Sequence, residues 1–211
     1  MAHPELRSLG VFCGANFGRN PAFRQAAEGL AELLARRRVR LIYGGGNVGL
    51  MGVLADTAMQ HGGDVVGIIP SHLHDREVAH HGITELRLVP SMHERKRQIY
   101  ELSDAVMTLP GGMGSLDELF ETLTWNQLDL HHRPCGLLNV GGYWDPLLAQ
   151  LDRAVEEGFV RPQHRALLLV DDDAPTLLDR LTAEYRAAGA APRTSQWVRP
   201  APLASVGTDI P

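Results

Sequence analysis

VRLIYGGGNVGLMG, residues 39–52, is the stretch that indicates the fold most directly. An apolar run of strand length is followed by three successive glycines and then by the start of a helical segment. A strand that turns through glycines directly into a helix is typical of a βα unit in a parallel sheet.

Six further apolar runs of strand length repeat this pattern. They cover residues 9–14, 64–70, 85–90, 104–110, 134–140 and 166–170, with amphipathic segments between them. Strands that are apolar on both faces predict helices on both sides of the sheet. We therefore expect a single α/β domain over residues 1–187, a Rossmann-like open doubly wound parallel sheet of about seven strands. Residues 188–211 have the composition of a loop and are expected to form a tail, mobile or packed on a partner chain.

Composition limits the classes of function. The 211 residues are 44% hydrophobic, which suits one substantial core, and the formal charge of −5 argues against nucleic acid as a partner. The chain has no apolar run long enough for a signal sequence or a membrane span. Cys13 and Cys135 are far apart in apolar stretches, so we expect reduced core thiols and a cytoplasmic location.

Three glycine-rich loops follow predicted strands. Gly44, Gly46 and Gly49 match the dinucleotide fingerprint G-x-G-x-x-G by count. The acid that should follow about 20 residues later is Asp64, but it stands at the beginning of its strand, so a dinucleotide is disfavoured. Three successive glycines exceed what a turn needs and favour close approach of the backbone to a ligand. A possible nucleotide loop is therefore assigned to Gly14, Gly44, Gly45 and Gly46.

PGGMGS, residues 110–115, is the loop that best suits a phosphate. Its glycines can turn backbone N–H groups inward, and the helix expected to begin near Leu116 adds the partial positive charge of its N-terminus. Ser115 and Glu118 also form the pattern S-x-x-E, typical of a helix capping box. Glu118 is therefore open to two interpretations, a structural cap or a carboxylate placed beside the sugar of a bound nucleotide.

A second helix is expected to begin at Ser91, which forms a capping box with Glu94. Arg95 and Lys96 share the apolar face of this helix with Met92 and Ile99. Cations on such a face must reach solvent, meet anions or line a crevice. Lys96 is also the only lysine in the chain, and its place beside Arg95 favours a functional role.

MHERK at 92–96 and PGGMGSLDE at 110–118, with GGGNVGLMG at 44–52 upstream and TWNQL at 124–128 downstream, carry a family likeness. Over roughly residues 8–170 the chain resembles the LOG family of cytokinin-activating phosphoribohydrolases, whose hallmark is PGGxGTxxE. Ser115 replaces the usual threonine of that hallmark and keeps the hydroxyl.

The resemblance implies a Rossmann-like fold and homodimers or larger assemblies, with no metal or redox cofactor. It implies hydrolysis of the N-glycosidic bond of an adenosine-type nucleoside 5′-monophosphate, AMP or an N6-prenylated cytokinin riboside monophosphate, to free base and ribose 5-phosphate. It makes Arg95 and Glu118 the catalytic pair. The substrate-binding residues that it implies are Glu77, Lys96, Gly111, Gly112, Gly114, Ser115, Asp117 and Thr124.

Two other functions are considered. A non-catalytic nucleotide or cofactor carrier on the same fold is the main alternative, because fold does not guarantee chemistry. A pyridoxal-dependent decarboxylase would need Lys96 for its Schiff base, whereas the glycine loops suit a nucleotide phosphate.

Two groups of side chains are expected to have no part in chemistry. His72, His74, His80 and His81 lack a clear ligand set for a metal and are expected at the surface. Trp125 and Trp144 are expected in packing or at an interface.

Overall fold

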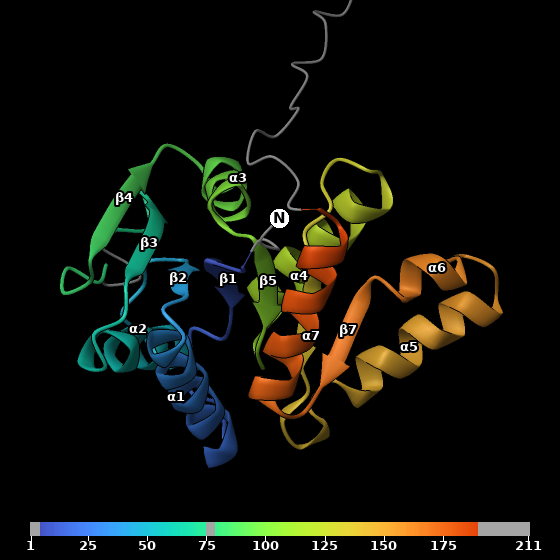
Figure 1. Cartoon of the computed structure of the whole chain (residues 1–211), viewed down its shortest axis with the longest axis horizontal. Helices are drawn as coiled ribbons and strands as arrows, with labels where there is room; N and C mark the ends of the chain where they lie inside the picture. The colour runs from blue at the N-terminus through green and yellow to red at the C-terminus, as the bar shows by residue number, and fades with distance from the viewer. Residues whose placement is uncertain (1–4, 75–78, 190–211) are drawn as a thin grey trace, which may run out of the picture.

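The computed structural model describes residues 5–74 and 79–189 and contains one seven-stranded sheet (Figure 1). The strands are β1 (Ser8–Phe12), β2 (Arg40–Tyr43), β3 (Val65–Pro70), β4 (Glu85–Val89), β5 (Ala105–Thr108), β6 (Cys135–Leu138) and β7 (Leu168–Asp171). All neighbouring strands pair in parallel, in the order β4-β3-β2-β1-β5-β6-β7. The predicted parallel sheet is confirmed, and the predicted strand ends differ from the observed ones by at most two residues.

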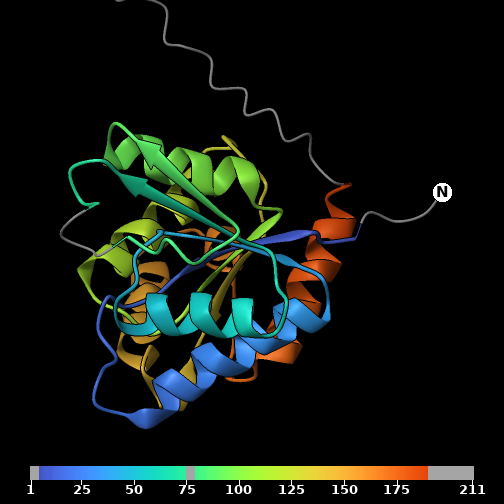
Figure 2. The same cartoon turned by 90° about the vertical axis from the view of Figure 1, so that its left-hand side faces the viewer.

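Helices cover both faces of the sheet. They are α1 (Pro21–Arg36), α2 (Gly49–Gln60), α3 (Met92–Leu102), α4 (Met113–Gln127), α5 (Asp145–Glu156), α6 (Pro162–Arg165) and α7 (Ala174–Ala187), with a short 3-10 turn at Val140–Gly142. Figure 2 shows α1 and α2 on one side of the sheet and α3 on the other. Among the described residues, no helix has both the length and the apolar character needed to cross a membrane.

Two hydrophobic cores follow from the alternation of side chains along the strands. In β2, Leu41 and Tyr43 join the core formed with α1, α2 and α7, whereas Ile42 faces the core formed with α3, α4 and α5. Successive residues of a strand point to opposite faces, so a fully apolar strand supplies both cores. The continuous apolar runs in the sequence have this physical cause.

The sheet has its switch point between β1 and β5. The chain runs outward from β1 through β2 and β3 to β4, then returns to place β5 on the other side of β1. The connections that leave β1 and β5 therefore diverge, and a crevice opens beyond their carboxyl ends. The two loops also contact each other, since Gly14 N–H donates to the Pro110 carbonyl at 3.1 Å.

Of the two helix starts expected from capping boxes, the one at Ser91 is confirmed and the one at Ser115 is wrong. Asn20 caps α1 by accepting from Ala22 N–H, and Ser91 caps α3 by accepting from Glu94 N–H. The cap predicted at Ser115 is wrong, because α4 begins at Met113 with Gly112 as its N-cap. Glycine is an acceptable N-cap residue, so Gly112 can take this position and the helix can begin two residues before Ser115.

Candidate active site

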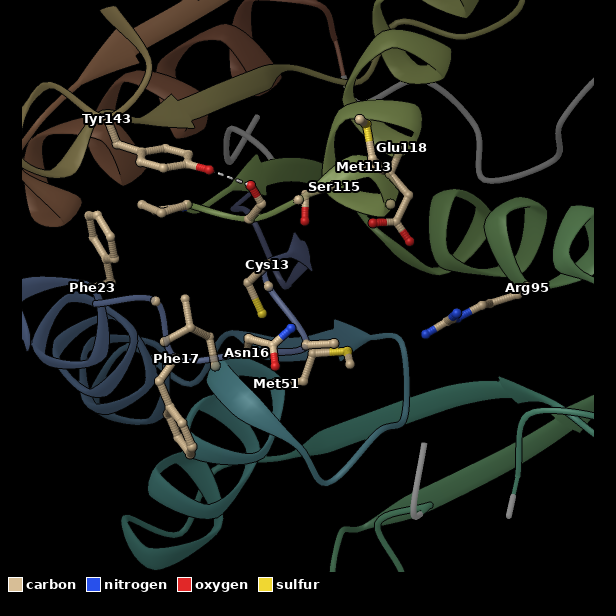
Figure 3. Close-up of a pocket in the computed structure, with 18 residues that line it drawn as sticks. Cys13, Asn16, Phe17, Phe23, Met51, Arg95, Met113, Ser115, Glu118 and Tyr143 are labelled. Atoms are coloured by element: carbon tan, nitrogen blue, oxygen red, sulfur yellow. Dashed lines mark hydrogen bonds between the residues drawn. The ribbon is translucent and has the colours of Figure 1, made fainter. Parts of the chain in front are cut away.

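A cavity of about 460 Å³ lies at the switch point of the sheet (Figure 3). The loop after β1, the loop after β5 and the beginning of α4 form most of its wall. Phe23 of α1, the beginning of α2, Arg95 of α3 and Tyr143 beyond β6 complete it. Its volume lies in the range of small-molecule sites. The residues that line it are Cys13, Gly14, Ala15, Asn16, Phe17, Gly18, Phe23, Leu50, Met51, Arg95, Pro110, Gly111, Gly112, Met113, Gly114, Ser115, Glu118 and Tyr143.

The loop at residues 110–115 presents open backbone to this cavity. A Cβ atom built on Gly112 or Gly114 would have no neighbour within 4 Å, so a ligand can approach the main chain there. Gly111 is different, because a Cβ atom on it would overlap the hydroxyl of the buried Ser115. The loop leads into the N-terminus of α4, where N–H groups without helical partners and the helix dipole favour an anion.

The glycines after β2 are used differently from the way predicted. Gly14 lines the cavity, but Gly44, Gly45 and Gly46 are not among its lining residues. A Cβ atom on Gly44 would overlap Nη2 of Arg95, and one on Gly45 would lie 3.1 Å from the backbone nitrogen of Ile68 in β3. The close approach that these two glycines allow is therefore to the protein's own groups.

Arg95 is buried on α3, with 4% of its surface exposed, and its guanidinium reaches the cavity. Its Nη2 donates to the Gly44 carbonyl at 2.8 Å and its Nε to the Ile68 carbonyl at 3.2 Å. The alternative that this side chain extends into solvent is thereby excluded. Main-chain acceptors just after β2 and within β3 hold the charge at the edge of the cavity.

Lys96 is also buried, at 6% exposure, but it does not line the cavity. Its ammonium lies 3.0 Å from Asp117 Oδ2 and 2.9 Å from Glu121 Oε2, both on α4. Burial by itself lowers the pKa of Lys96, but the bonds to Glu121 and Asp117 outweigh it and raise the pKa above its usual value. Lys96 therefore ties α3 to α4 as a charged group.

Glu118 reaches the cavity from the second turn of α4 and is half-buried. Its position after five helical residues excludes the capping interpretation. Figure 3 shows Glu118 and Arg95 near one end of the cavity, with Phe23 and Tyr143 at the other. The two residues expected to carry the chemistry thus approach one space from two helices.

Besides Lys96, two residues expected to bind substrate, Asp117 and Thr124, do not line the cavity. Asp117 and Thr124 are exposed on α4, and Asp117 is paired with Lys96. Glu77 lies outside the described residues, as do residues 190–211 of the expected tail.

Eleven of the residues that line the cavity were not individually assigned to it from the sequence. They are Cys13, Ala15, Asn16, Phe17, Gly18, Phe23, Leu50, Met51, Pro110, Met113 and Tyr143. Tyr143 could have been found, because it follows β6 at the same edge of the sheet, where ligands bind. The apolar residues carry no comparable signal, since phenylalanine and methionine near a helix start are equally typical of packing.

The histidines need one correction. His80 is buried, contrary to the expectation, because its Nε2 lies 3.0 Å from Asp56 Oδ1 and its Nδ1 accepts from Gly82 N–H. His72 and His81 are exposed and His74 is half-buried. In residues 5–74 and 79–189, no three His, Cys, Asp or Glu side chains gather in a way that could hold a metal ion.

The expected packing residues are confirmed. Trp144 is buried in the core beneath α5, and Trp125 packs against that core. Cys13 and Cys135 are both buried free thiols, and burial raises the pKa of each, to about 12 for Cys135. Neither thiol is poised to ionise at neutral pH.

Comparisons with known proteins agree with this geometry. Residues 51–181 match a family model described as "Possible lysine decarboxylase". Over 173 residues the chain is 49% identical to the cytokinin riboside 5′-monophosphate phosphoribohydrolase of Rhodococcoides fascians, covering 82% of this chain and 87% of that one. It is 45% identical over 177 residues to the cytokinin riboside 5′-monophosphate phosphoribohydrolase LOG7 of Arabidopsis thaliana, covering 83% and 81%.

Solved structures share the fold at lower identity. The molybdenum cofactor binding protein of Rippkaea orientalis matches with a TM-score of 0.64 at 22% identity, over 84% of this chain and 96% of that one. The molybdenum cofactor carrier protein of Chlamydomonas reinhardtii matches with the same TM-score at 16% identity, over 85% and 98%. At such identities the likeness concerns the architecture alone.

Proposed function

The chain belongs to the LOG family, and from this premise we propose that it hydrolyses the N-glycosidic bond of adenosine-type nucleoside 5′-monophosphates. The products are the free base and ribose 5-phosphate. The substrates are AMP and N6-prenylated cytokinin riboside monophosphates, and the second class corresponds to the names of the relatives from Rhodococcoides fascians and Arabidopsis thaliana.

The observation that carries this proposal is the open glycine loop beside a carboxylate in one cavity. Gly112 and Gly114 leave room for a phosphate at the N-terminus of α4, and Glu118 lines the same cavity one helical turn further on. A 5′-phosphate bound at the loop brings the attached ribose toward the carboxylate. Binding energy remote from the reacting carbon thereby positions the sugar.

Glu118 is proposed to stabilise the positive charge that develops at the anomeric carbon. In the reaction the bond from this carbon to the base nitrogen breaks, and its electron pair leaves with the base. Water attacks the anomeric carbon, and the proton that it loses passes by way of the carboxylate, directly or through solvent, to the departing base, which leaves as the neutral purine. Glu118 orients and deprotonates that water, so no metal is needed for the step.

Arg95 is proposed to hold the nucleotide or its departing base. A guanidinium is a poor proton donor in the acid–base sense, but it offers several N–H groups in a fixed plane. The bonds to the Gly44 and Ile68 carbonyls fix that plane before the substrate arrives. Arg95 therefore acts through hydrogen bonds and charge.

The pyridoxal alternative is disfavoured by the surroundings of Lys96. Schiff-base formation needs a neutral amine, whereas the bonds to Glu121 and Asp117 stabilise the ammonium. Lys96 is also absent from the cavity lining. A carrier function without catalysis is suggested only by structures below 25% identity, which share the fold.

We also propose a homodimer that buries the outer face of α4. The exposed side chains there include Met113, Phe120 and, at the end of the helix, Leu128. Asp117 and Thr124 share this side at helical spacing, so a second copy would cover them. The substrate contacts expected of Asp117, Thr124 and the neighbouring Lys96 would then be made in a site that the second copy completes.

A cytoplasmic location is also proposed, and the two reduced core thiols support it.

The test of the proposed function is direct. Purified protein incubated with AMP or with isopentenyl-AMP should release adenine or isopentenyladenine together with ribose 5-phosphate, both resolved by chromatography. A protein that binds these nucleotides and returns them unchanged over many hours would instead be a carrier.

A further inference from the structure

Tyr143 follows β6 and projects into the cavity from the side opposite Arg95 (Figure 3). The loop that carries it is well held, because Asn139 Oδ1 accepts from Trp144 N–H at 2.7 Å and Asn139 Nδ2 donates to Asp145 Oδ1 at 2.7 Å. Sequence reasoning assigned no role to this residue. Its contacts indicate one.

The hydroxyl of Tyr143 donates to the Gly111 carbonyl at 2.6 Å, inside the glycine loop. Its ring packs edge-on against Phe23 of α1, with centroids 5.3 Å apart. Phe23 in turn covers Gly18 in the loop after β1, because a Cβ atom on Gly18 would lie 2.7 Å from the Phe23 ring. Tyr143 therefore connects the two loops that form the cavity.

The hydrogen bond to Gly111 fixes the direction of a peptide group. The described residues contain no cis peptide, so the Gly111 carbonyl and the Gly112 N–H point in opposite directions. Glycines lie on both sides of this bond, and glycine readily adopts the conformations that a rotated peptide plane requires. With its oxygen held by Tyr143, the carbonyl cannot turn toward a bound anion, and the Gly112 N–H keeps its direction.

We propose that Tyr143 is a positioning residue for the phosphate loop, holding the Gly111–Gly112 peptide in the orientation that binds the 5′-phosphate. The proposal rests on the phosphate position in the proposed function. Tyr143 then affects phosphate affinity through the Gly111–Gly112 peptide group, and its hydroxyl does not contact the N-glycosidic bond that breaks. A carbonyl free to rotate would present its negative end to the anion in part of the molecules, which lowers the apparent affinity.

The test compares Tyr143→Phe with Tyr185→Phe. Both changes remove one hydrogen-bonded phenol hydroxyl, but Tyr185 donates to Asp104 Oδ1 at 3.1 Å and lies outside the cavity. Binding of ribose 5-phosphate and of inorganic phosphate is measured by calorimetry, with adenine as a ligand that lacks phosphate. Tyr143→Phe should weaken both phosphate ligands by about tenfold, the value of one ordinary hydrogen bond, and leave adenine binding unchanged. Tyr185→Phe should change none of them.

A kinetic measurement supplies a second readout. Tyr143→Phe should raise the KM for AMP and leave kcat within about twofold, because the hydroxyl affects binding and transition state equally. Unchanged affinity for ribose 5-phosphate, or an equal loss for adenine, would overturn the inference. Because these binding measurements need no turnover, a wild-type protein that binds ribose 5-phosphate but releases no base would refute the proposed function and leave the role of Tyr143 open to the same test.

Discussion

At the scale of single residues, His131 shows how burial sets the behaviour of an ionisable group. Its ring stacks on Tyr100 with centroids 5.4 Å apart and meets Trp125 edge-on at 6.0 Å. Burial, with smaller contributions from Arg133 and His132, lowers the pKa of His131 to about 4. The folded protein therefore holds this imidazole neutral at pH values where an unfolded chain would protonate it.

The stability of the protein should consequently fall between about pH 6.5 and pH 4. Above pH 6.5 the ring is neutral in both states, and below it the unfolded state gains a proton that the folded state excludes. The loss should approach about 3 kcal/mol near pH 4, given a pKa lowered from 6.5 to about 4. His131→Phe keeps the ring packing and should flatten this part of the curve of unfolding free energy against pH. The exposed His72, changed to Gln, serves as the control and should leave the curve unchanged, and parallel curves for wild type and His131→Phe would refute the explanation.

Arg95 and Glu118 could be predicted from the sequence to different degrees. Arg95 lies on an otherwise apolar helix face, and burial of that face was a physical expectation that the structure confirms. Glu118 had a competing explanation as a cap, which only the observed helix start at Met113 removes. The sequence pattern could not show this, because several glycines in succession leave the first residue of a helix undetermined.

At the scale of elements, the turn between β2 and α2 supports the neighbouring helix α3. The φ angle of Gly44 is not positive, so its backbone conformation is one that residues with a side chain also adopt. What excludes a side chain is the guanidinium of Arg95, which occupies the space that a Cβ atom would need. The glycines that resemble a dinucleotide fingerprint thus include one, Gly44, that makes room for the guanidinium of Arg95 from α3.

Gly44→Ala should therefore reduce activity although Gly44 does not line the cavity. The new methyl group displaces the Arg95 guanidinium from the Gly44 carbonyl, so kcat/KM should fall by about tenfold or more, the scale of one lost charged hydrogen bond. The control is Gly29→Ala in α1, where a Cβ atom meets nothing within 4 Å. Steady-state rates with AMP measure the effect, and a fully active Gly44→Ala protein would show that the position of Arg95 is unimportant.

Elements of regular structure were easier to predict than their contacts. Apolar runs placed all seven strands, because a strand covered on both faces has to be apolar throughout. The burial of His80 was missed, since its partner Asp56 belongs to α2 and pairing across 24 residues leaves no local pattern. The same limitation hid the contact between the rings of Phe23 and Tyr143, which meet only after the sheet has formed.

At the scale of the whole molecule, the order of the strands creates the site. The loops after β1 and β5 are about 100 residues apart in the chain, and they meet because these two strands pair at the switch point. The side of α4 away from the sheet remains apolar in part, with Phe120 40% and Leu128 59% exposed. Such a face at the border of the cavity is what the proposed dimer would cover.

Phe120→Arg should separate the proposed dimer into monomers, because a charge would be buried without a partner at the interface. Light scattering coupled to size-exclusion chromatography measures the mass of each species. Phe159→Arg, at another strongly exposed aromatic residue between α5 and α6, should keep the mass of the wild type. A wild-type protein that is already monomeric at micromolar concentration would contradict the dimer.

The central claim, that Glu118 makes this cavity a hydrolytic site, is tested most directly by base release from AMP in three proteins: wild type, Glu118→Gln and Glu156→Gln. Glutamine keeps the size of residue 118 and removes its charge, so Glu118→Gln should fold normally, bind AMP and release adenine at least about a hundredfold more slowly. Glu156 is exposed on α5, and its change to Gln should leave the rate unaltered. Adenine release by Glu118→Gln within a few-fold of the wild-type rate would contradict the account.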